Sequence, residues 1–101
     1  MIIYNTTINI NENIVDEFAK WIKQEYIPKI IATNLFIDIN LFEVLVEEEM
    51  GGITFSLQHS MKNMETYNEF NEKHFKDFDK LMHDRFTNNY VTFSTILQKV
   101  D

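Results

Sequence analysis

The chain has 101 residues and a mass of 12.1 kDa, which leaves room for a single domain with one hydrophobic core over residues 1–101. Its 45% hydrophobic and 14% aromatic residues exclude intrinsic disorder, and its acidic net charge of −7 makes nucleic acid and anionic membrane surfaces poor partners. The sequence contains no cysteine, which excludes disulfides, thiolate catalysis and zinc–thiolate sites. Because there is no apolar run near about 18 residues and no signal-like start, we expect a soluble, cytoplasmic chain.

The period of the apolar residues changes along the chain and predicts the order of the elements. Residues 2–10 alternate between two sides, which is typical of a half-buried strand. A helix is expected next, capped by the side chain of Asn11 or Asn13 and with acidic residues in its first turn. Its apolar stripe includes Trp21 and faces the sheet.

A proline interrupts this first helix. Pro28 has no N–H to donate, so the helix is predicted to break near Tyr26 and to restart as one short turn through residues 30–31. Asn34 tolerates the left-handed conformation and is expected to end the segment. Mostly β-branched and aromatic residues then predict a long strand over residues 36–47.

The second half of the chain contains a hairpin, a helix and a last strand. The glycines of the turn 48–52 allow positive φ angles and lead into a strand over residues 53–60. Asn63 is expected to cap a single helix that runs to about Arg85, because apolar residues there recur at spacings of three and four. Residues 90–100 are predicted to form the last strand.

The order β-α-β-β-α-β predicts an α+β, ferredoxin-like fold, with a four-stranded antiparallel sheet and two helices on one face. The uncovered face is informative because its expected residues are polar but almost uncharged, whereas a sheet that faces bulk water normally carries Lys, Glu and Arg. We therefore expect this face to pair with a second copy, giving a homodimeric α+β barrel; the alternative is a monomer with a solvated face. The residues assigned to the face are Asn5, Thr7, Asn9, Asp38, Asn40, Thr54, Ser56, Gln58, Thr92 and Ser94.

Several segments carry a resemblance to a known family. They are Met1-Ile2-Ile3-Tyr4-Asn5, Trp21 with Tyr26-Ile27-Pro28, Ala32-Thr33-Asn34-Leu35-Phe36, and the hairpin from Val46 to Ser56. Over nearly its whole length the chain resembles an uncharacterised family of short bacterial proteins, a domain of unknown function similar to the dimeric α+β barrel superfamily. The resemblance implies the barrel-forming dimer but no activity. The family pattern has His-Ile-Pro where this chain has Tyr26, which removes a titratable imidazole from that position.

Three histidines are candidates for acid–base chemistry near neutral pH. His74 lies on the inner stripe of the second predicted helix, where the simpler interpretation is a histidine at the edge of the core that bonds a backbone carbonyl. His83 falls toward the opposite side of that helix, and His59 is expected at a solvated strand end. No pattern of metal ligands or catalytic residues accompanies them, so we assign no catalytic residue and no metal site, and the cofactor is unknown.

The leading functional hypothesis is a protein that binds a small molecule in a cleft or lumen. The candidate residues combine apolar bulk with polar tips near the boundary between helices and sheet: Tyr4, Trp21, Tyr26 and His74.

Two other classes of function remain open. Superfamily relatives include cofactor-free monooxygenases and haem-degrading enzymes, which place a strand Asn, a Trp and a helix His around a cleft. By that resemblance, Asn5 or Asn9 would lie beside His74. The third class is a structural or partner-binding module with an exposed apolar patch.

Overall fold

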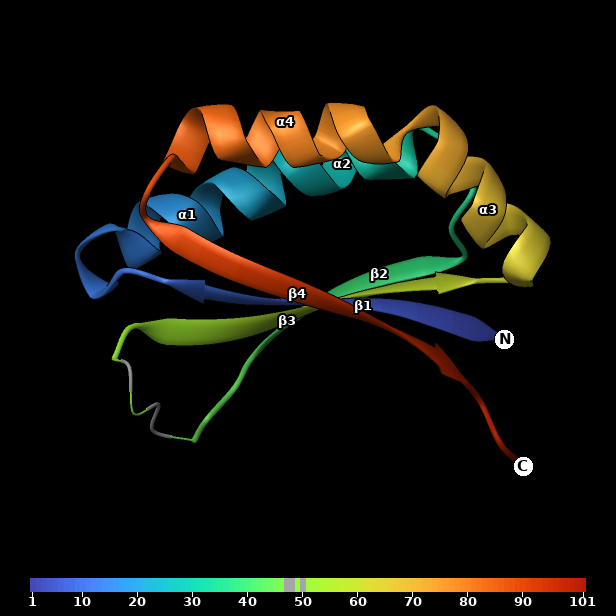
Figure 1. The fold of residues 1–101 in the computed structure, drawn as a ribbon, viewed down its shortest axis with the longest axis horizontal. Helices are drawn as coiled ribbons and strands as arrows, with labels where there is room; N and C mark the ends of the chain where they lie inside the picture. The colour runs from blue at the N-terminus through green and yellow to red at the C-terminus, as the bar shows by residue number, and fades with distance from the viewer. Residues whose placement is uncertain (47–48, 50) are drawn as a thin grey trace.

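The protein was analysed as a computed structural model, which describes residues 1–46, 49 and 51–101 (Figure 1). Its element order confirms the predicted β-α-β-β-α-β arrangement, although each predicted helix consists of more than one segment. The elements are β1 (Ile2–Ile10), η1 (Glu12–Ile14), α1 (Val15–Trp21), η2 (Ile22–Tyr26), α2 (Ile27–Ile31), β2 (Asp38–Glu43), β3 (Ile53–Met61), α3 (Met64–Lys73), α4 (Phe75–Phe86) and β4 (Tyr90–Gln98).

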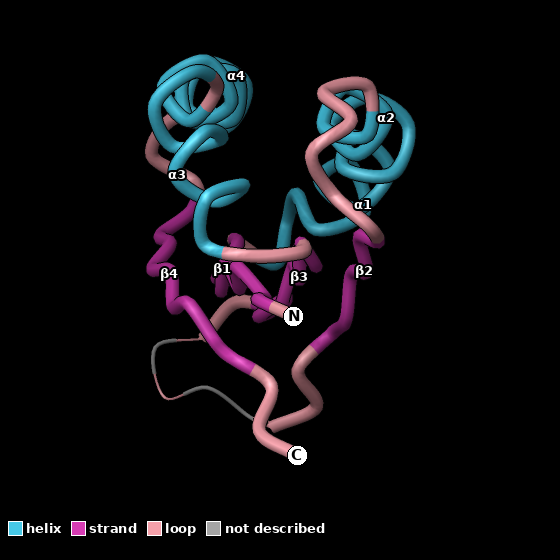
Figure 2. Tube along the Cα trace, turned by 90° about the vertical axis from the view of Figure 1, so that its right-hand side faces the viewer, coloured by secondary structure: helices cyan, strands magenta, loops and turns pink. Residues whose placement is uncertain are grey.

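The four strands form one antiparallel sheet in the order β2-β3-β1-β4. β1 pairs along its whole length with β3 on one side and with β4 on the other. All helices lie on one face of this sheet, as Figure 2 shows end-on, with α1 and α2 toward the β2 edge and α3 and α4 toward the β4 edge. The predicted ferredoxin-like α+β fold is therefore confirmed.

The helical segment before β2 is continuous, which corrects the predicted break near Tyr26. The backbone stays in the right-handed helical region from Trp21 through Ile27, and the segment 22–26 forms a wider π-helical turn. Pro28 lies in the first turn of α2, directly after that π turn, where its missing N–H interrupts the helical hydrogen bonds least. Asn34 has a φ of 61°, so its left-handed conformation is confirmed.

The second predicted helix is divided, which is a further correction. His74 has φ −127° and ψ −26°, outside helical values, and separates α3 from α4. The predicted cap at Asn63 is confirmed, because its side-chain oxygen accepts a hydrogen bond from the backbone N–H of Thr66 at 3.0 Å. By contrast, Asn11 makes no side-chain cap and Asn13 lies within the short η1 turn, so the cap predicted for the first helix is wrong.

The second strand is shorter than predicted, since β2 covers residues 38–43 rather than the predicted range from Phe36 onward. The predicted end of that strand at Glu47, and Glu48 and Met50 of the hairpin turn, lie outside the described residues.

The core lies between the sheet and the helices and is rich in aromatic rings. The Phe18 ring centroid is 5.5 Å from Phe55 and 5.3 Å from Phe86, and Trp21 meets Phe86 edge to face at 5.1 Å. From β1, alternate residues face this core and are buried, except that Thr6 is only half-buried. The helix-facing row of β1 therefore contains one polar interruption.

The faces of β4 are the reverse of the prediction. Thr92 pairs with Ile8 and Ser94 pairs with Thr6, so both lie on the helix-facing side of the sheet. The assignment of these two residues to the helix-free face is therefore wrong. The helix-free row of β4 is instead mostly apolar and comprises Val91, Phe93, Thr95 and Leu97.

His59 is buried, which corrects its expected place at a solvated strand end. It is only 1% exposed and lies in the helix-facing row of β3. Its Nδ1 lies 2.9 Å from the backbone carbonyl of Tyr4, which makes Nδ1–H the donor and leaves Nε2 as an acceptor. Among the described residues Nε2 has no hydrogen-bond partner. Burial lowers the pKa of His59 to about 4, partly offset by the Tyr4 carbonyl.

The buried neutral imidazole predicts a loss of stability in mild acid. The unfolded chain takes up a proton on His59 near pH 6.5, whereas the folded chain does so only near pH 4. Between these values the unfolded state binds more protons, so the free energy of unfolding falls as the pH falls, by up to ~3 kcal/mol from this residue. Chemical denaturation at a series of pH values measures it. His59→Asn should flatten this part of the profile, whereas the exposed His83→Asn should leave it unchanged; identical profiles for all three proteins would contradict the assignment.

The β2–β3 hairpin is tied to the middle of the sheet by Asn9. The Asn9 side-chain amide donates to the Gly51 carbonyl at 3.0 Å and to the Thr54 hydroxyl at 3.1 Å. Gly52 has a φ of 75°, and a Cβ there would lie 2.7 Å from both Asn9 Oδ1 and the Ile10 carbonyl oxygen. Both the conformation and the space at this position therefore require glycine.

Alanine substitutions separate these two requirements. Gly51 has a similar φ of 78° but open space around it, so Gly51→Ala should cost about 1 kcal/mol for the left-handed conformation alone. Gly52→Ala adds the clash with Asn9 and should cost roughly 2–3 kcal/mol. Urea denaturation of both variants measures the difference, and equal costs would show that the contact with Asn9 imposes no constraint.

Candidate functional site

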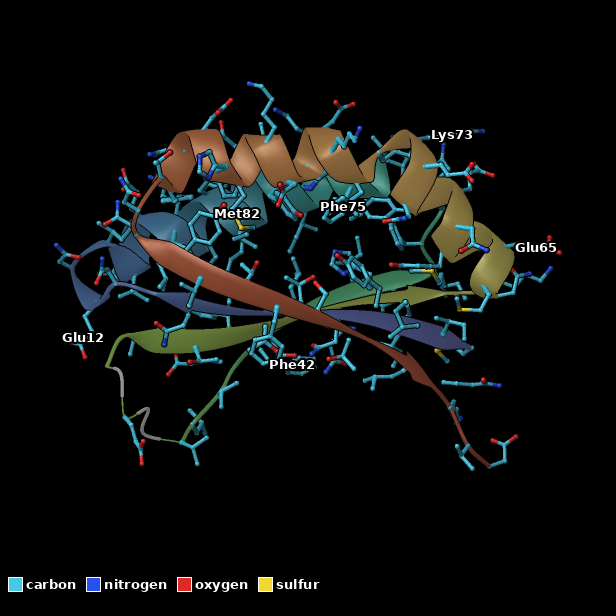
Figure 3. All side chains as sticks on the ribbon, viewed as in Figure 1. Glu12, Phe42, Glu65, Lys73, Phe75 and Met82 are labelled. Atoms are coloured by element: carbon cyan, nitrogen blue, oxygen red, sulfur yellow. The ribbon has the colours of Figure 1, made fainter. Side chains whose placement is uncertain are left out.

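A cleft opens between α4 and the β1–β4 pair. It holds about 60 Å³ of space, room for a few water molecules or a compact chemical group. Phe75 and Met82 project from the sheet-facing side of α4 toward it (Figure 3). The lining residues are Tyr4, Thr6, Tyr26, Phe70, Phe75, Phe78, Asp79, Met82, Tyr90, Thr92 and Ser94.

The polar part of the cleft exists because Thr6 interrupts the apolar row of β1. The pairing of β1 with β4 sets Ser94 directly beside Thr6, and their hydroxyl oxygens lie 3.4 Å apart. Ser94 also donates to the Tyr4 hydroxyl oxygen at 3.2 Å. Thr92 and Ser94 are exposed, whereas Tyr4 is buried, so the hydroxyl groups run from the core to the open side of the cleft along β4.

The ionisable groups of the cleft are all acids. Burial raises the pKa of the Tyr26 hydroxyl, and the neighbouring Tyr4, Asp79 and Tyr90 raise it further. Burial and the Asp79 carboxylate likewise raise the pKa of Tyr90. The phenols of Tyr26 and Tyr90 therefore stay protonated at neutral pH and are able to donate hydrogen bonds to a ligand.

The structure brings two of the four predicted ligand residues together. Tyr4 and Tyr26 both line the cleft. Trp21 lies behind Tyr26, with ring centroids 5.4 Å apart, and is buried in the core. His74 lines a separate open groove between α2 and α4, where its ring stacks on Phe70.

The grouping suggested by the oxygenase resemblance is not assembled. Asn5 and Asn9 lie on the helix-free face of the sheet, opposite the side that carries the helices. His74 lies at the junction of the two helices on the other side. The structure therefore does not bring His74 to either asparagine, as the oxygenase alternative would require.

Sequence reasoning missed the residues that define the open side of the cleft. Thr92 and Ser94 were expected on the other face, while Tyr90 and Asp79 were not singled out. The residues of β4 that face the helices are set by its pairing with β1. Thr92 and Ser94 could have been placed correctly only if the pairing of Tyr90 with Ile10 were known in advance. For Asp79 the signal was its spacing, four residues after Phe75 and three before Met82 on α4.

The helix-free face is a second candidate surface. The rows through Asn5, Thr7 and Asn9 have polar residues on both central strands, whereas the row through Ile3 does not, and several rows have apolar residues at the edges. One row runs Phe42, Ser56, Thr7 and Phe93. Phe42 is 49% and Phe93 is 65% exposed, and Figure 3 shows Phe42 on the side away from the helices.

The central polar residues of this face satisfy one another. Ser56 donates to Asn5 Oδ1 at 2.6 Å, and the Asn5 amide donates to the Thr7 hydroxyl at 3.2 Å. Gln58 donates to Ser56 at 3.3 Å. Side chains that are already paired in this way lose little when water is removed from the face.

No group of three His, Asp or Glu side chains in the described ranges could hold a metal ion. No helix in the same part of the chain is long and apolar enough to span a membrane.

Solved structures with the same fold come from distant proteins. HapK from Hahella chejuensis superimposes with a TM-score of 0.72 at 8% identity, over 99% of this chain and 93% of that one. A dimeric ferredoxin-like protein from an uncultured marine organism gives 0.72 at 16% identity, over 100% and 96%. An ethyl tert-butyl ether (EthD) family protein from Bacillus halodurans gives a TM-score of 0.71 at 10% identity, over 99% and 100%. At these identities the likeness shows the fold alone.

Sequence comparison gives the family. No curated protein matches the chain. The resemblance seen in the amino-acid sequence is confirmed at the level of family and fold, since the matching family is a domain of unknown function and the similar structures are ferredoxin-like. Because the match covers residues 1–100, the chain belongs to the family described as Domain of unknown function (DUF4286).

Proposed function

We propose that the protein is a homodimer that binds a small molecule in the cleft between α4 and the β1–β4 pair. The observation that carries this proposal is the line of hydroxyl groups from Tyr4 through Ser94 to Thr92 beside a wall of aromatic rings. Sites for small organic ligands usually combine a mainly apolar recess with a few polar groups that point into it. The site needs no metal or imidazole for this role.

Burial supports the same conclusion. Tyr4 and Tyr26 are only 7% and 8% exposed, so their rings are held in place by packing before any ligand arrives. A ligand that meets fixed hydroxyl groups loses less entropy on binding than one that must order them. The candidate contacts are therefore Tyr4 and Tyr26, with Ser94 and Thr92 on the open side. Trp21 supports the Tyr26 ring from behind.

Compact probes with one hydroxyl test the cleft. In amide-detected NMR titrations, isopropanol and tert-butanol should shift the signals of Thr6, Thr92 and Ser94, because these residues line the cleft. Ser94→Trp fills the open side and should abolish the shifts. Asn71→Trp places the same ring on the exposed surface of α3 and should leave them unchanged. Shifts scattered over the surface, and insensitive to Ser94→Trp, would rule out the cleft as the binding site.

The homodimer is proposed through the helix-free face of the sheet. This face carries exposed Phe42, Val91, Phe93 and Leu97 around a polar centre whose groups are already hydrogen-bonded. The apolar residues gain by leaving water, and the polar centre loses little. In Figure 2 both outer strands, β2 and β4, extend below the central strands on the side away from the helices. The dimeric state of the similar marine protein supports a homodimer.

A charge on this face should separate the two copies. Phe93→Asp places a carboxylate among apolar residues and should weaken the dimer by about 30-fold, or roughly 2 kcal/mol. Size-exclusion chromatography with light scattering at several concentrations measures the effect. Ile31→Asp is the matched control, because Ile31 is 56% exposed on the helical side. A wild-type protein that elutes as a 12.1 kDa monomer at micromolar concentration would overturn the proposal.

A further inference from the structure

The chemical character of the cleft restricts the ligand it can take. Four of its lining residues are ionisable, namely Tyr4, Tyr26, Asp79 and Tyr90, and each of them is an acid. No Lys, Arg or His side chain lines the cleft in the part of the chain that the structure describes. A carboxylate or phosphate ligand would therefore meet the negative charge of Asp79 without a compensating cation.

Among the described residues, no base forms an ion pair with the carboxylate of Asp79. The ion pairs found among the described residues join Lys73 to Glu69, Lys80 to Asp84, and Arg85 to Glu17. Lys80, the residue after Asp79, pairs with Asp84 at 2.6 Å. Lys76 and His83, three residues before Asp79 and four after it on α4, form no ion pair with it in the described part of the chain. The negative charge of Asp79 at the cleft therefore has no ion-pair partner there.

Aromatic rings form a connected wall on the same cleft. The ring centroid of Tyr4 is 6.0 Å from that of Phe70, which is 6.0 Å from Phe78, which is in turn 5.6 Å from Tyr26. The faces of such rings carry partial negative charge and attract cations, most strongly where water is excluded. Two independent features, the carboxylate and the rings, therefore favour the same sign of ligand charge.

The size of the cleft limits what enters it. Its volume of about 60 Å³ is smaller than the roughly 150 Å³ cavity that holds a benzene ring. A compact group fits, and the rest of a ligand extends along the open side, where Thr92 and Ser94 are exposed.

We propose that the ligand of this cleft is a small organic cation, whose ammonium head lies against the aromatic wall and Asp79 while its polar tail reaches the hydroxyl groups of Thr92 and Ser94. This inference rests on the proposed function and names the ligand class of that site. A methylated ammonium head is nearly as bulky as a benzene ring, so the cleft takes one side of it against the rings and Asp79 and leaves the rest at the open side.

A matched pair of probes tests the charge alone. Choline and 3,3-dimethyl-1-butanol have the same shape and the same hydroxyl, but choline carries a quaternary nitrogen where the alcohol carries a carbon. In amide-detected NMR titrations of the full chain at constant ionic strength, choline should bind at the cleft about tenfold more tightly than the alcohol. Asp79→Asn should reduce that preference by at least about threefold. Asp77→Asn, with the same change of charge on the same helix but beside the other groove, should not.

The outcomes separate this inference from the proposed function. Equal affinity for the two probes, with shifts at Thr6, Thr92 and Ser94, would overturn the cationic ligand and keep the cleft as a binding site. A preference for choline that survives Asp79→Asn unchanged would overturn the part assigned to that carboxylate. If choline causes no shift, while isopropanol still causes cleft shifts that Ser94→Trp abolishes, the inference alone is overturned. No cleft shift with any probe would overturn both.

Discussion

The fold depends on the pairing of β1 with a strand on each side along its whole length. This pairing fixes which residue of β3 and β4 lies beside each residue of β1, and so fixes both faces of the sheet. On the helical side it aligns Ile8 and Ile10 under the helices, where they are fully buried. On the other side it aligns Asn5 and Thr7 with Ser56 and Gln58. The core, the cleft and the polar centre of the free face all follow from this one register.

The cleft and the helix-free face lie on opposite sides of the same sheet. Above the sheet, α4 leaves the helix-facing row of β4 uncovered, and polar side chains occupy the space. Below the sheet, the same strand exposes Val91, Phe93 and Leu97. β4 therefore contributes its polar row to the candidate ligand site and its apolar row to the proposed interface.

The sequence predicts the element order, the antiparallel sheet and the side on which the helices lie, because long periodic segments specify these features. It misplaces the faces of β4, since polarity alone puts Thr92 and Ser94 outward, whereas the pairing with Ile8 and Thr6 puts them toward the helices. Residues two apart on a strand lie on the same face of the sheet. The apolar Leu57 could therefore have indicated that His59 points toward the helices. The break at His74 has no such signal, because neither Gly nor Pro marks it, and only tertiary packing separates α3 from α4.

Tyr4 belongs to two parts of the molecule at once. Its backbone carbonyl accepts the hydrogen bond from buried His59, while its phenol accepts from Ser94 in the cleft. The imidazole ring also lies against the phenol ring, with centroids 5.1 Å apart. The floor of the candidate ligand site is thus held in place by a buried core residue. If the cleft binds the proposed ligand, its preference depends on a core position, and substitutions at position 59 should alter it without any contact to the ligand.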